Sequence, residues 1–387
     1  MRTSGEQGKK LVVNALTYKK NNSGIGVMLR ELCGAYSRAA KRPCQIVMPK
    51  DSPDFPVGEG TEFIHIPWDH KDGFRRMWFQ TFGLGKVYCR DAILLTSDSK
   101  CPLILPKSCT LLPLVTDLAV YRMPKAYRLS RVLLWRLQYC YIRHRADHFL
   151  AISEFTKSEM VELWKLPEEK IDIVPCACSD TLRREEDPKR LQAVREKYQL
   201  PEQFVLFVGN SNPRKNLERL IRAFDLAKGE KGFCHQLVIA GEQGWKFDRQ
   251  KAVKDTKHPE AIRFIGFVPD EDMAALYSSA SLFVFPTLYE GFGIPVLEAQ
   301  VCGVPVLTSR CTSLPEVGGE GAWYVDPYSE DEIAEGIGKL LTEPELAVEL
   351  VKRGRENVRR FSWEDSAKQL EEIIEKEVRA HGHSGTL

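Results

Sequence analysis

Two successive series of short apolar runs alternate with helical stretches along this chain, and they constrain its fold more than any other feature. In the first half, the runs predict strands at residues 11–16, 44–49, 62–67, 92–97, 110–115 and 148–153. In the second half, they predict strands at residues 203–210, 236–241, 261–268, 281–286 and 304–309. This alternation is typical of parallel sheets with helices on both faces. We therefore expect an α/β protein of two doubly wound, Rossmann-like domains facing a central cleft, with ligands beyond the carboxyl ends of the strands.

The chain has 387 residues, which is enough for two such domains. A charged stretch containing Pro188 and Pro201 interrupts the alternation, and we predict that it is the interdomain linker. The expected boundaries are an N-terminal domain at 1–182, the linker at 183–201 and a C-terminal domain at 202–361. A last helix is predicted at 362–380 from its apolar spacing.

Composition excludes several classes of protein. The formal net charge is +2, so no global field indicates a nucleic-acid partner. The eleven cysteines include no C-x-x-C pair, which favours free thiols in a reducing compartment. No apolar run reaches the length of about 18 residues that a membrane span needs, and the N-terminal run is too short for a signal peptide. We expect a cytoplasmic protein.

The segment at 281–307 carries the strongest chemical signal. A buried strand is predicted first, then a loop with Gly291 and Gly293, then a helix whose first turn suits Pro295. Free backbone N–H groups and the helix dipole make such a helix start an anion site, and glycine lets the backbone approach a phosphate or sugar. Two carboxylates, Glu290 and Glu298, flank this loop. Each could be an ordinary helix acid, but beside an anion site a carboxylate has a use in hydrogen bonding sugar hydroxyls.

This segment resembles the E-x7-E motif of the family-4 retaining glycosyltransferases, in particular their mannosyltransferase-like branch. The resemblance implies the GT-B architecture and a nucleotide-sugar donor as substrate. It also implies that Glu290 contacts the donor hexose and that Glu298 holds the nucleotide ribose. Phe292 and Gly293 would offer backbone N–H groups to the donor, beside Gly291.

Residues 207–224 resemble the strand, loop and helix of the same family whose lysine pairs with the donor diphosphate, which is Lys215 here. Arg214 is a candidate second cation, since guanidinium matches phosphate geometry. Many relatives have an arginine directly after the first glycine of the loop, where this chain has Asn210. An exposed basic turn is the alternative for the pair. The segment around Trp363 resembles the terminal helix that crosses back onto the N-terminal domain.

Two further segments resemble donor-binding parts of the family. Gly266, Phe267 and Val268 correspond to residues near the nucleotide base. Gly24 and Gly26, within the sequence NNSGIG, correspond to the first glycine loop, which approaches the diphosphate and the acceptor. The alternative for this G-x-G is a flexible turn. It is not a dinucleotide fingerprint, because Leu29 replaces the third glycine.

The chain departs from the family where relatives read His-Asp-Leu beside the anomeric carbon. Here Thr116 precedes Asp117 and Leu118. A threonine hydroxyl can hydrogen bond a sugar but cannot carry the charge of imidazole. We keep Thr116 and Asp117 in the expected catalytic site with Glu290, because the mechanism suggested for this family uses the leaving phosphate as the base. The alternative interpretation is a non-catalytic protein that binds a nucleotide or a glycan. A nicotinamide oxidoreductase would also fit the fold class, but this chain lacks the dinucleotide-binding fingerprint of such enzymes.

Residues 270–272 read Asp-Glu-Asp, like the D-x-D metal motif of another glycosyltransferase fold. Their position at a predicted helix start favours a role at the free N–H groups and the dipole, so we expect no required metal and no other cofactor. Between residues 122 and 145 the chain carries seven Lys or Arg and no acid, with Trp135, Tyr139 and Tyr141 among them. This stretch predicts either peripheral contact with an anionic membrane or a solvated helix face.

The predicted function is transfer of a hexose, with mannose favoured, from a nucleotide-diphosphate sugar to a glycan or glycolipid acceptor. GDP-mannose or a UDP-sugar is the expected donor. Polysaccharide or lipopolysaccharide biosynthesis is the expected setting, at the cytoplasmic face of the membrane.

Overall fold

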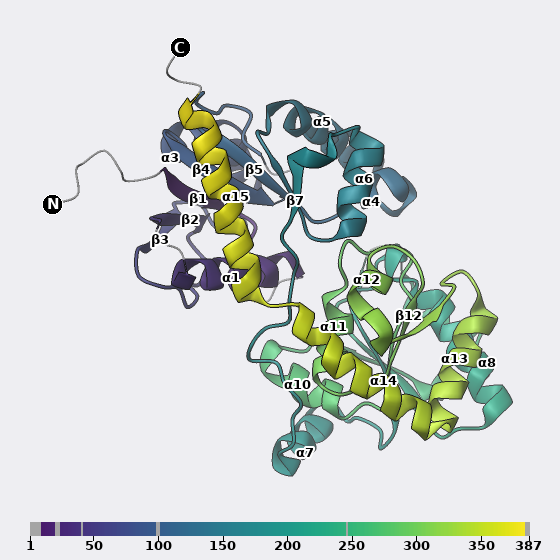
Figure 1. Ribbon diagram of the computed structural model, residues 1–387. Helices are drawn as coiled ribbons and strands as arrows, with labels where there is room; N and C mark the ends of the chain where they lie inside the picture. Colours follow the sequence, from purple (N-terminus) through teal and green to yellow (C-terminus); the bar gives the residue numbers. More distant parts are fainter. Residues whose placement is uncertain (1–8, 20–23, 40–41, 98–100, 245–246, 384–387) are drawn as a thin grey trace. The chain divides into compact units, whose positions relative to one another are not determined.

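The computed structural model describes residues 9–19, 24–39, 42–97, 101–244 and 247–383. It divides into two compact units, drawn in Figure 1. Unit 1 comprises Met1–Cys176 and Phe361–Leu387, and unit 2 comprises Ala177–Arg360. No helix in the described part of the chain is both long and apolar enough to cross a lipid bilayer.

Unit 1 is built on a parallel sheet of seven strands in the order β3-β2-β1-β4-β5-β6-β7. The strands are β1 (Lys10–Asn14), β2 (Cys44–Pro49), β3 (Thr61–Ile66), β4 (Ala92–Ser97), β5 (Thr110–Val115), β6 (Phe149–Ala151) and β7 (Ile171–Ile173). Every residue of β4 and β5 is buried, as expected for central strands of a sheet covered on both faces.

The helices of unit 1 connect these strands. They are α1 (Gly24–Ala39), α2 (Gly73–Trp78), the π-helix η1 (Phe79–Gly83), α3 (Leu84–Tyr88), α4 (Ala119–Arg122), η2 (Pro124–Ala126), α5 (Leu129–Arg145), α6 (Glu154–Trp164), η3 (Glu168–Lys170) and the terminal α15 (Trp363–His383). Helix α15 packs against α1, although more than 320 residues of chain separate their starts (Figure 1). Tyr36 of α1 donates a hydrogen bond to Glu371 of α15, which fixes this contact.

Unit 2 has a parallel sheet of six strands in the order β10-β9-β8-β11-β12-β13. The strands are β8 (Phe204–Val208), β9 (Gln236–Ala240), β10 (Ile262–Gly266), β11 (Leu282–Phe285), β12 (Val306–Ser309) and β13 (Trp323–Val325). Both sheets therefore contain the doubly wound strand order of the Rossmann fold, and the order reverses at β1/β4 and at β8/β11. The prediction of two Rossmann-like parallel-sheet domains is confirmed.

The helices of unit 2 are α7 (Pro188–Lys197), η4 (Pro213–Lys215), α8 (Leu217–Lys231), α9 (Arg249–Lys254), η5 (Pro259–Ala261), α10 (Asp270–Ser278), α11 (Ile294–Val301), α12 (Leu314–Gly318), η6 (Gly319–Gly321), α13 (Glu330–Thr342), α14 (Pro344–Asn357) and η7 (Val358–Arg360). Phenylalanines of β8 and β11 lie at the centre of its core, where the rings of Phe207 and Phe285 are 6.0 Å apart.

Residues 183–201, predicted as a linker, lie inside unit 2, and the boundary falls at Cys176 instead. Ten of these residues form α7, which packs on α10. The buried carboxylate of Asp272 explains the difference, because it accepts hydrogen bonds from Arg190 at 3.0 Å, Lys197 at 2.6 Å and Tyr198 at 2.8 Å. Charged residues of this stretch therefore hold α7 against α10 of unit 2.

Candidate functional site

Two loops of unit 2 meet where its strand order reverses. One leaves the carboxyl end of β8 and runs through η4 into α8, and the other leaves β11 and enters α11. The carboxyl ends of neighbouring parallel strands lie at the same edge of the sheet, which is the usual ligand site in such folds. The backbone joins the loops directly, since the N–H of Leu288 donates to the carbonyl of Arg214 at 2.8 Å.

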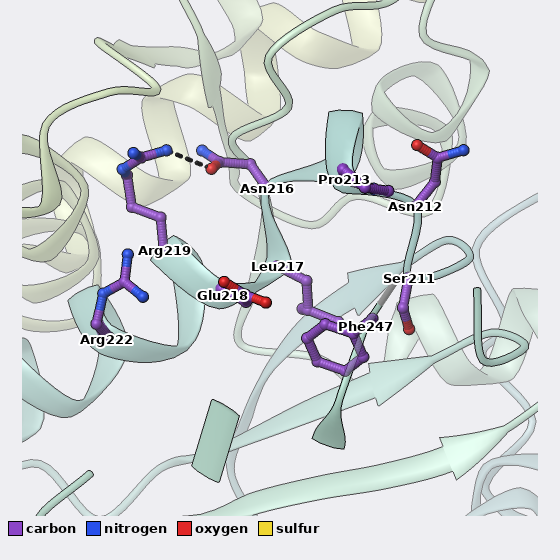
Figure 2. Close-up of a pocket in the computed structure, with 9 residues that line it drawn as sticks. All are labelled: Ser211, Asn212, Pro213, Asn216, Leu217, Glu218, Arg219, Arg222 and Phe247. Carbon is purple, nitrogen blue, oxygen red and sulfur yellow. Dashed lines mark hydrogen bonds between the residues drawn. The ribbon is translucent and has the colours of Figure 1, made fainter. Parts of the chain in front are cut away.

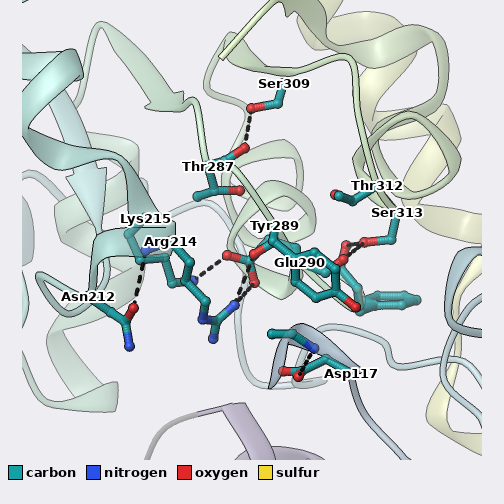
Figure 3. Close-up of polar contacts among 12 residues, drawn as sticks. Asp117, Asn212, Arg214, Lys215, Thr287, Tyr289, Glu290, Ser309, Thr312 and Ser313 are labelled. Atoms are coloured by element: carbon teal, nitrogen blue, oxygen red, sulfur yellow. Dashed lines mark hydrogen bonds and ion pairs between the residues drawn. The ribbon is translucent and has the colours of Figure 1, made fainter. Parts of the chain in front are cut away.

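An ion triad lies at this junction (Figure 3). The Glu290 carboxylate is 3.0 Å from Arg214 Nη1 through Oε2 and 2.8 Å from Lys215 Nζ through Oε1. Arg214 also donates to the carbonyl of Tyr289 at 3.1 Å, and Lys215 Nζ lies 4.6 Å from the ring centre of Phe285. The sequence predicted all three charged residues, and the structure brings them together.

The electrostatics of the triad keep Glu290 ionised. Burial alone would raise the pKa of this carboxyl, because burial penalises the charged form. The charges of Arg214 and Lys215 outweigh that penalty, and the pKa of Glu290 is lowered. The arrangement is thus two cations on one backbone turn, sharing a single carboxylate.

The glycine loop next to the triad is tightly anchored. Gly293 precedes α11 with φ at 113°, a conformation that side chains with a Cβ rarely adopt. A Cβ built on Gly293 would come within 2.6 Å of Leu314 Cδ2. The buried hydroxyl of Ser313 donates to the carbonyls of Glu290 and Phe292, at 3.0 and 2.7 Å. The predicted site residues Gly291, Phe292 and Gly293 therefore form a rigid, largely buried turn that leads into a helix N-terminus.

Glu298 is the fifth residue of α11, and its Oε2 accepts a hydrogen bond from the hydroxyl of Tyr277 at 2.7 Å. Burial raises the pKa of the Glu298 carboxyl, the Tyr277 hydroxyl opposes that rise and Asp270 adds to it. The pKa values of the two motif glutamates are thus shifted in opposite directions. The shift favours the charged form of Glu290 and the neutral form of Glu298.

The predicted base-binding residues follow β10. Gly266 ends that strand with φ at 76°, and its carbonyl accepts from Gly241 N at 2.7 Å. Phe267 is 43% exposed and Val268 is buried. An exposed phenylalanine beside a positive-φ glycine, at the same sheet edge as the triad, offers a flat apolar surface for a base.

The remaining predicted site residues lie in unit 1. Thr116 is buried directly after β5, and Asp117 Oδ1 accepts from Ala119 N at 3.0 Å, which starts α4. Gly24 and Gly26 were predicted in a loop, but both lie in the first turn of α1. Residues 21–23 of that predicted loop lie outside the described residues. The structure thus gives Asp117 a local structural bond and makes the two glycines a helix start.

Sequence reasoning missed Tyr277 and Ser313, which hold the two glutamates and lie on a different helix and loop. It also missed a pocket of about 160 Å³ beside the start of α8 (Figure 2). Its lining does not include the triad and consists of Ser211, Asn212, Pro213, Asn216, Leu217, Glu218, Arg219, Arg222 and Phe247. Nothing in the spacing of these residues signals a cavity.

The Asp-Glu-Asp stretch occupies the first turn of α10, as predicted. Asp272 is buried and accepts hydrogen bonds from Lys197 and Tyr198, so this acid holds α7. Among the residues that the structure describes, no group of three or more His, Cys, Asp or Glu side chains could hold a metal ion. The absence of a metal requirement stays a prediction.

Comparison with known proteins agrees with this geometry. The family model described as "Glycosyl transferases group 1" matches residues 190–357, which include the triad and both motif glutamates. The O-antigen chain mannosyltransferase B of Escherichia coli is 35% identical over 256 residues, covering 65% of this chain and 67% of that protein. The serotype-specific mannosyltransferase WbdA of the same species is 33% identical over 232 residues, covering 58% of this chain and only 28% of its own length.

Solved structures share the fold at low identity. The sucrose-phosphate synthase of Thermosynechococcus elongatus superposes with a TM-score of 0.73 at 21% identity, covering 96% of this chain and all (100%) of that one. WaaG, a glycosyltransferase involved in lipopolysaccharide biosynthesis, gives a TM-score of 0.71 at 16% identity, covering 94% and 99% of the two chains. These likenesses identify the GT-B fold. Together with the sequence relatives, they show that this chain belongs to the group 1 glycosyltransferases.

Proposed function

We propose that this chain transfers a hexose, with mannose favoured, from a nucleoside-diphosphate sugar to a glycan or lipid-linked acceptor, with retention at the anomeric carbon. The mannosyltransferase relatives and the ion triad support this proposal. Assembly of a surface polysaccharide or lipopolysaccharide is the setting that the O-antigen relative suggests.

The observation that carries the proposal is the pairing of Glu290 with two cations. A diphosphate would bind Arg214 and Lys215 in place of the carboxylate, since phosphate oxygens match guanidinium and ammonium donors. The displaced Glu290 carboxylate would then accept hydrogen bonds from hydroxyls of the sugar attached to that diphosphate. Glu298 would accept from the ribose hydroxyls, beside its hydrogen bond from Tyr277.

In the reaction, the bond between the anomeric carbon and the diphosphate oxygen breaks, and a bond from the acceptor oxygen to the same carbon forms on the same face. The acceptor proton passes to the leaving phosphate oxygen, which serves as the base. Arg214, Lys215 and the N–H groups at the start of α11 would stabilise the negative charge that develops on the diphosphate. Thr116 would hydrogen bond the sugar where relatives have histidine.

The first test is a thermal shift of the purified protein with UDP, GDP, ADP, CMP and NAD. At about 100 times its dissociation constant, a nucleotide should add roughly 2.7 kcal/mol of stability. A shift with GDP or UDP, followed by transfer of labelled sugar from the matching donor, is expected. A shift with no transfer to any acceptor or to water would favour the non-catalytic alternative, and a shift with NAD alone would contradict the proposal.

Glu298→Gln is expected to lose most of the nucleotide shift while the free protein becomes somewhat more heat-stable. Because folding raises the pKa of Glu298, the stability that its protonated form contributes is lost as the pH rises through the folded pKa. Glutamine is neutral at all pH values and still accepts from Tyr277, so the gain should appear at pH 7 and vanish below the unfolded pKa. Glu349→Gln, on the exposed side of α14, is the control and should change neither quantity appreciably.

A further inference from the structure

Unit 1 exposes an extensive apolar surface that the proposed sugar transfer does not use. We call it the apolar face of unit 1 and define it by its exposed residues: Phe74, Met77, Trp78, Phe82, Leu103, Ile104, Leu129, Leu133, Leu134 and Leu137. Large contiguous apolar patches are uncommon on soluble proteins and mark interaction sites. Three neighbouring segments of the chain contribute to it.

The leucines of α5 form its best-defined part. Leu129, Leu133 and Leu137 recur at every fourth residue, so they lie on one side of the helix, with exposed fractions of 83%, 61% and 61%. The opposite side of α5 is buried in the core of unit 1 through Val132, Tyr139 and Ile142. A helix that is apolar on both sides explains why sequence periodicity predicted only a basic helix here.

Two arginines of α5 lie on either side of its exposed leucines. At 100° per residue, Arg136 projects on one edge of the stripe, and Arg131 projects on the other side of the helix, beyond Leu134. Arg131 lies 5.5 Å from the ring centre of Trp135, and Arg136 lies 5.1 Å from that of Tyr121. An apolar centre with cationic edges and aromatic rings is the pattern of helices that lie in the interface of a bilayer.

A second stripe comes from α2 and η1. Phe74, Trp78 and Phe82 again recur at every fourth residue, and the rings of Trp78 and Phe82 are 5.9 Å apart. The segment at 101–104 joins the two stripes. Leu103 N donates to the carbonyl of Thr81 in η1 at 2.8 Å, and the carbonyl of Leu103 accepts from Tyr141 of α5 at 3.0 Å.

The charges of the three segments have one sign. Residues 73–90 carry four Lys or Arg, residues 101–110 carry one and residues 119–145 carry seven, and none of these segments contains an Asp or Glu. Arg122 and Arg145 pair with acids of neighbouring segments, and Arg143 donates to the carbonyl of Trp164, so these three serve the fold. Arg90 also lies 3.9 Å from the carboxylate of Asp91. The exposed residues Arg75, Arg128, Arg131 and Arg136 lie on or directly beside the helices that carry the apolar residues, and they give the apolar face a basic border.

We propose that the apolar face of unit 1 docks on an anionic lipid bilayer, with the leucines of α5 and the aromatic rings of α2 and η1 inserted among the lipids. Charge complementarity selects this partner, because a basic border attracts acidic headgroups while the uncharged centre gains free energy in the acyl region. The proposal is independent of the proposed activity, since binding to lipid requires neither donor nor acceptor.

Sedimentation with vesicles tests this surface. The full chain is expected to sediment with phosphatidylcholine vesicles that contain about one quarter phosphatidylglycerol, and much less with phosphatidylcholine alone. Replacing Leu133 and Leu137 together with serine should lower the partition coefficient at least about tenfold. Raising salt from about 0.1 to about 0.5 M should weaken binding as well.

Matched variants separate lipid binding from misfolding. Val348→Ser removes a side chain that is 68% exposed on α14 of unit 2, and it should leave the partition coefficient unchanged. Charge reversal at Arg128 and Arg131 should remove the preference for phosphatidylglycerol, and reversal at Arg359 of η7 should not. Wild-type protein that stays in the supernatant, or a leucine variant that sediments as well as wild type, would overturn the proposal. So would a dimer that the leucine substitutions abolish, since the face would then belong to a second copy of the chain.

Discussion

Replacing Glu290 with glutamine is expected to lower turnover about 100-fold or more while leaving affinity for the bare nucleoside diphosphate unchanged or higher. Glutamine keeps the shape of the side chain but removes the charge that Arg214 and Lys215 now share. A diphosphate no longer has to displace a carboxylate from these cations. The sugar, however, loses its charged hydrogen-bond acceptor, so catalysis suffers where binding does not.

The same substitution should destabilise the free protein at neutral pH by about 3 kcal/mol, because it leaves two partly buried cations without their counter-ion. The lowered pKa of Glu290 fixes the pH dependence. A carboxyl with a depressed folded pKa stabilises the protein above its unfolded pKa, and this contribution is lost as the pH falls through the folded pKa. Urea unfolding of wild type and variant should therefore differ most near pH 7 and converge in acid.

Glu330→Gln is the matched control. Its carboxylate pairs with Arg222 at 2.7 Å and lies 4.0 Å from Arg219, but it is 37% exposed and lies outside the two loops of the site. Exposed ion pairs contribute about 1 kcal/mol or less. The control should change turnover little and should show only a small dependence of stability on pH. Equal losses of turnover in both variants would mean that Glu290 has no special place at the donor.

The strands were predictable because central parallel strands are uninterrupted apolar runs. The segment at 92–97, for instance, reads as a strand from its composition alone, and all its residues are buried. Strands β7 and β13, of three residues each, were missed, although the equally short β6 was predicted within the apolar run at 148–153. Two adjacent domains of the same type followed from the repeated alternation.

The misplaced linker shows what a one-dimensional pattern omits. Charged residues at 183–201 suggested exposure. Two of them, Arg190 and Lys197, and the hydroxyl of Tyr198 instead bind the carboxylate of Asp272, which lies 70 or more residues further along the chain. The candidate site likewise depends on contacts between residues that are distant in the sequence. The motif spacing indicated Glu290 and Glu298, whereas Tyr277 and Ser313 contact them only through the fold. No local pattern distinguishes such a tyrosine or serine from any other.

Replacing Gly293 with alanine is expected to remove nucleotide binding and to destabilise unit 2 by about 3 kcal/mol. The residue has φ at 113°, which costs alanine of order 1–3 kcal/mol, and its new Cβ would lie 2.6 Å from Leu314 Cδ2. The loop would have to shift, and the N–H groups that precede α11 would shift with it.

A matched glycine separates strain from overlap. Gly232 ends α8 with φ at 65°, and a Cβ built there meets nothing within 4 Å, so Gly232→Ala should cost only about 1 kcal/mol and leave nucleotide binding intact. Adding Leu314→Ala to Gly293→Ala removes the overlapping methyl and should restore part of the nucleotide shift, although Leu314→Ala alone is destabilising because its side chain is buried. Nucleotide stabilisation measured by thermal shift with the cognate diphosphate for wild type, the two single variants at Gly293 and Leu314 and the double variant gives the coupling energy between the two sites. If the coupling energy is zero, the effect of Gly293→Ala comes from its backbone conformation alone, and the overlap with Leu314 has no role in positioning the loop.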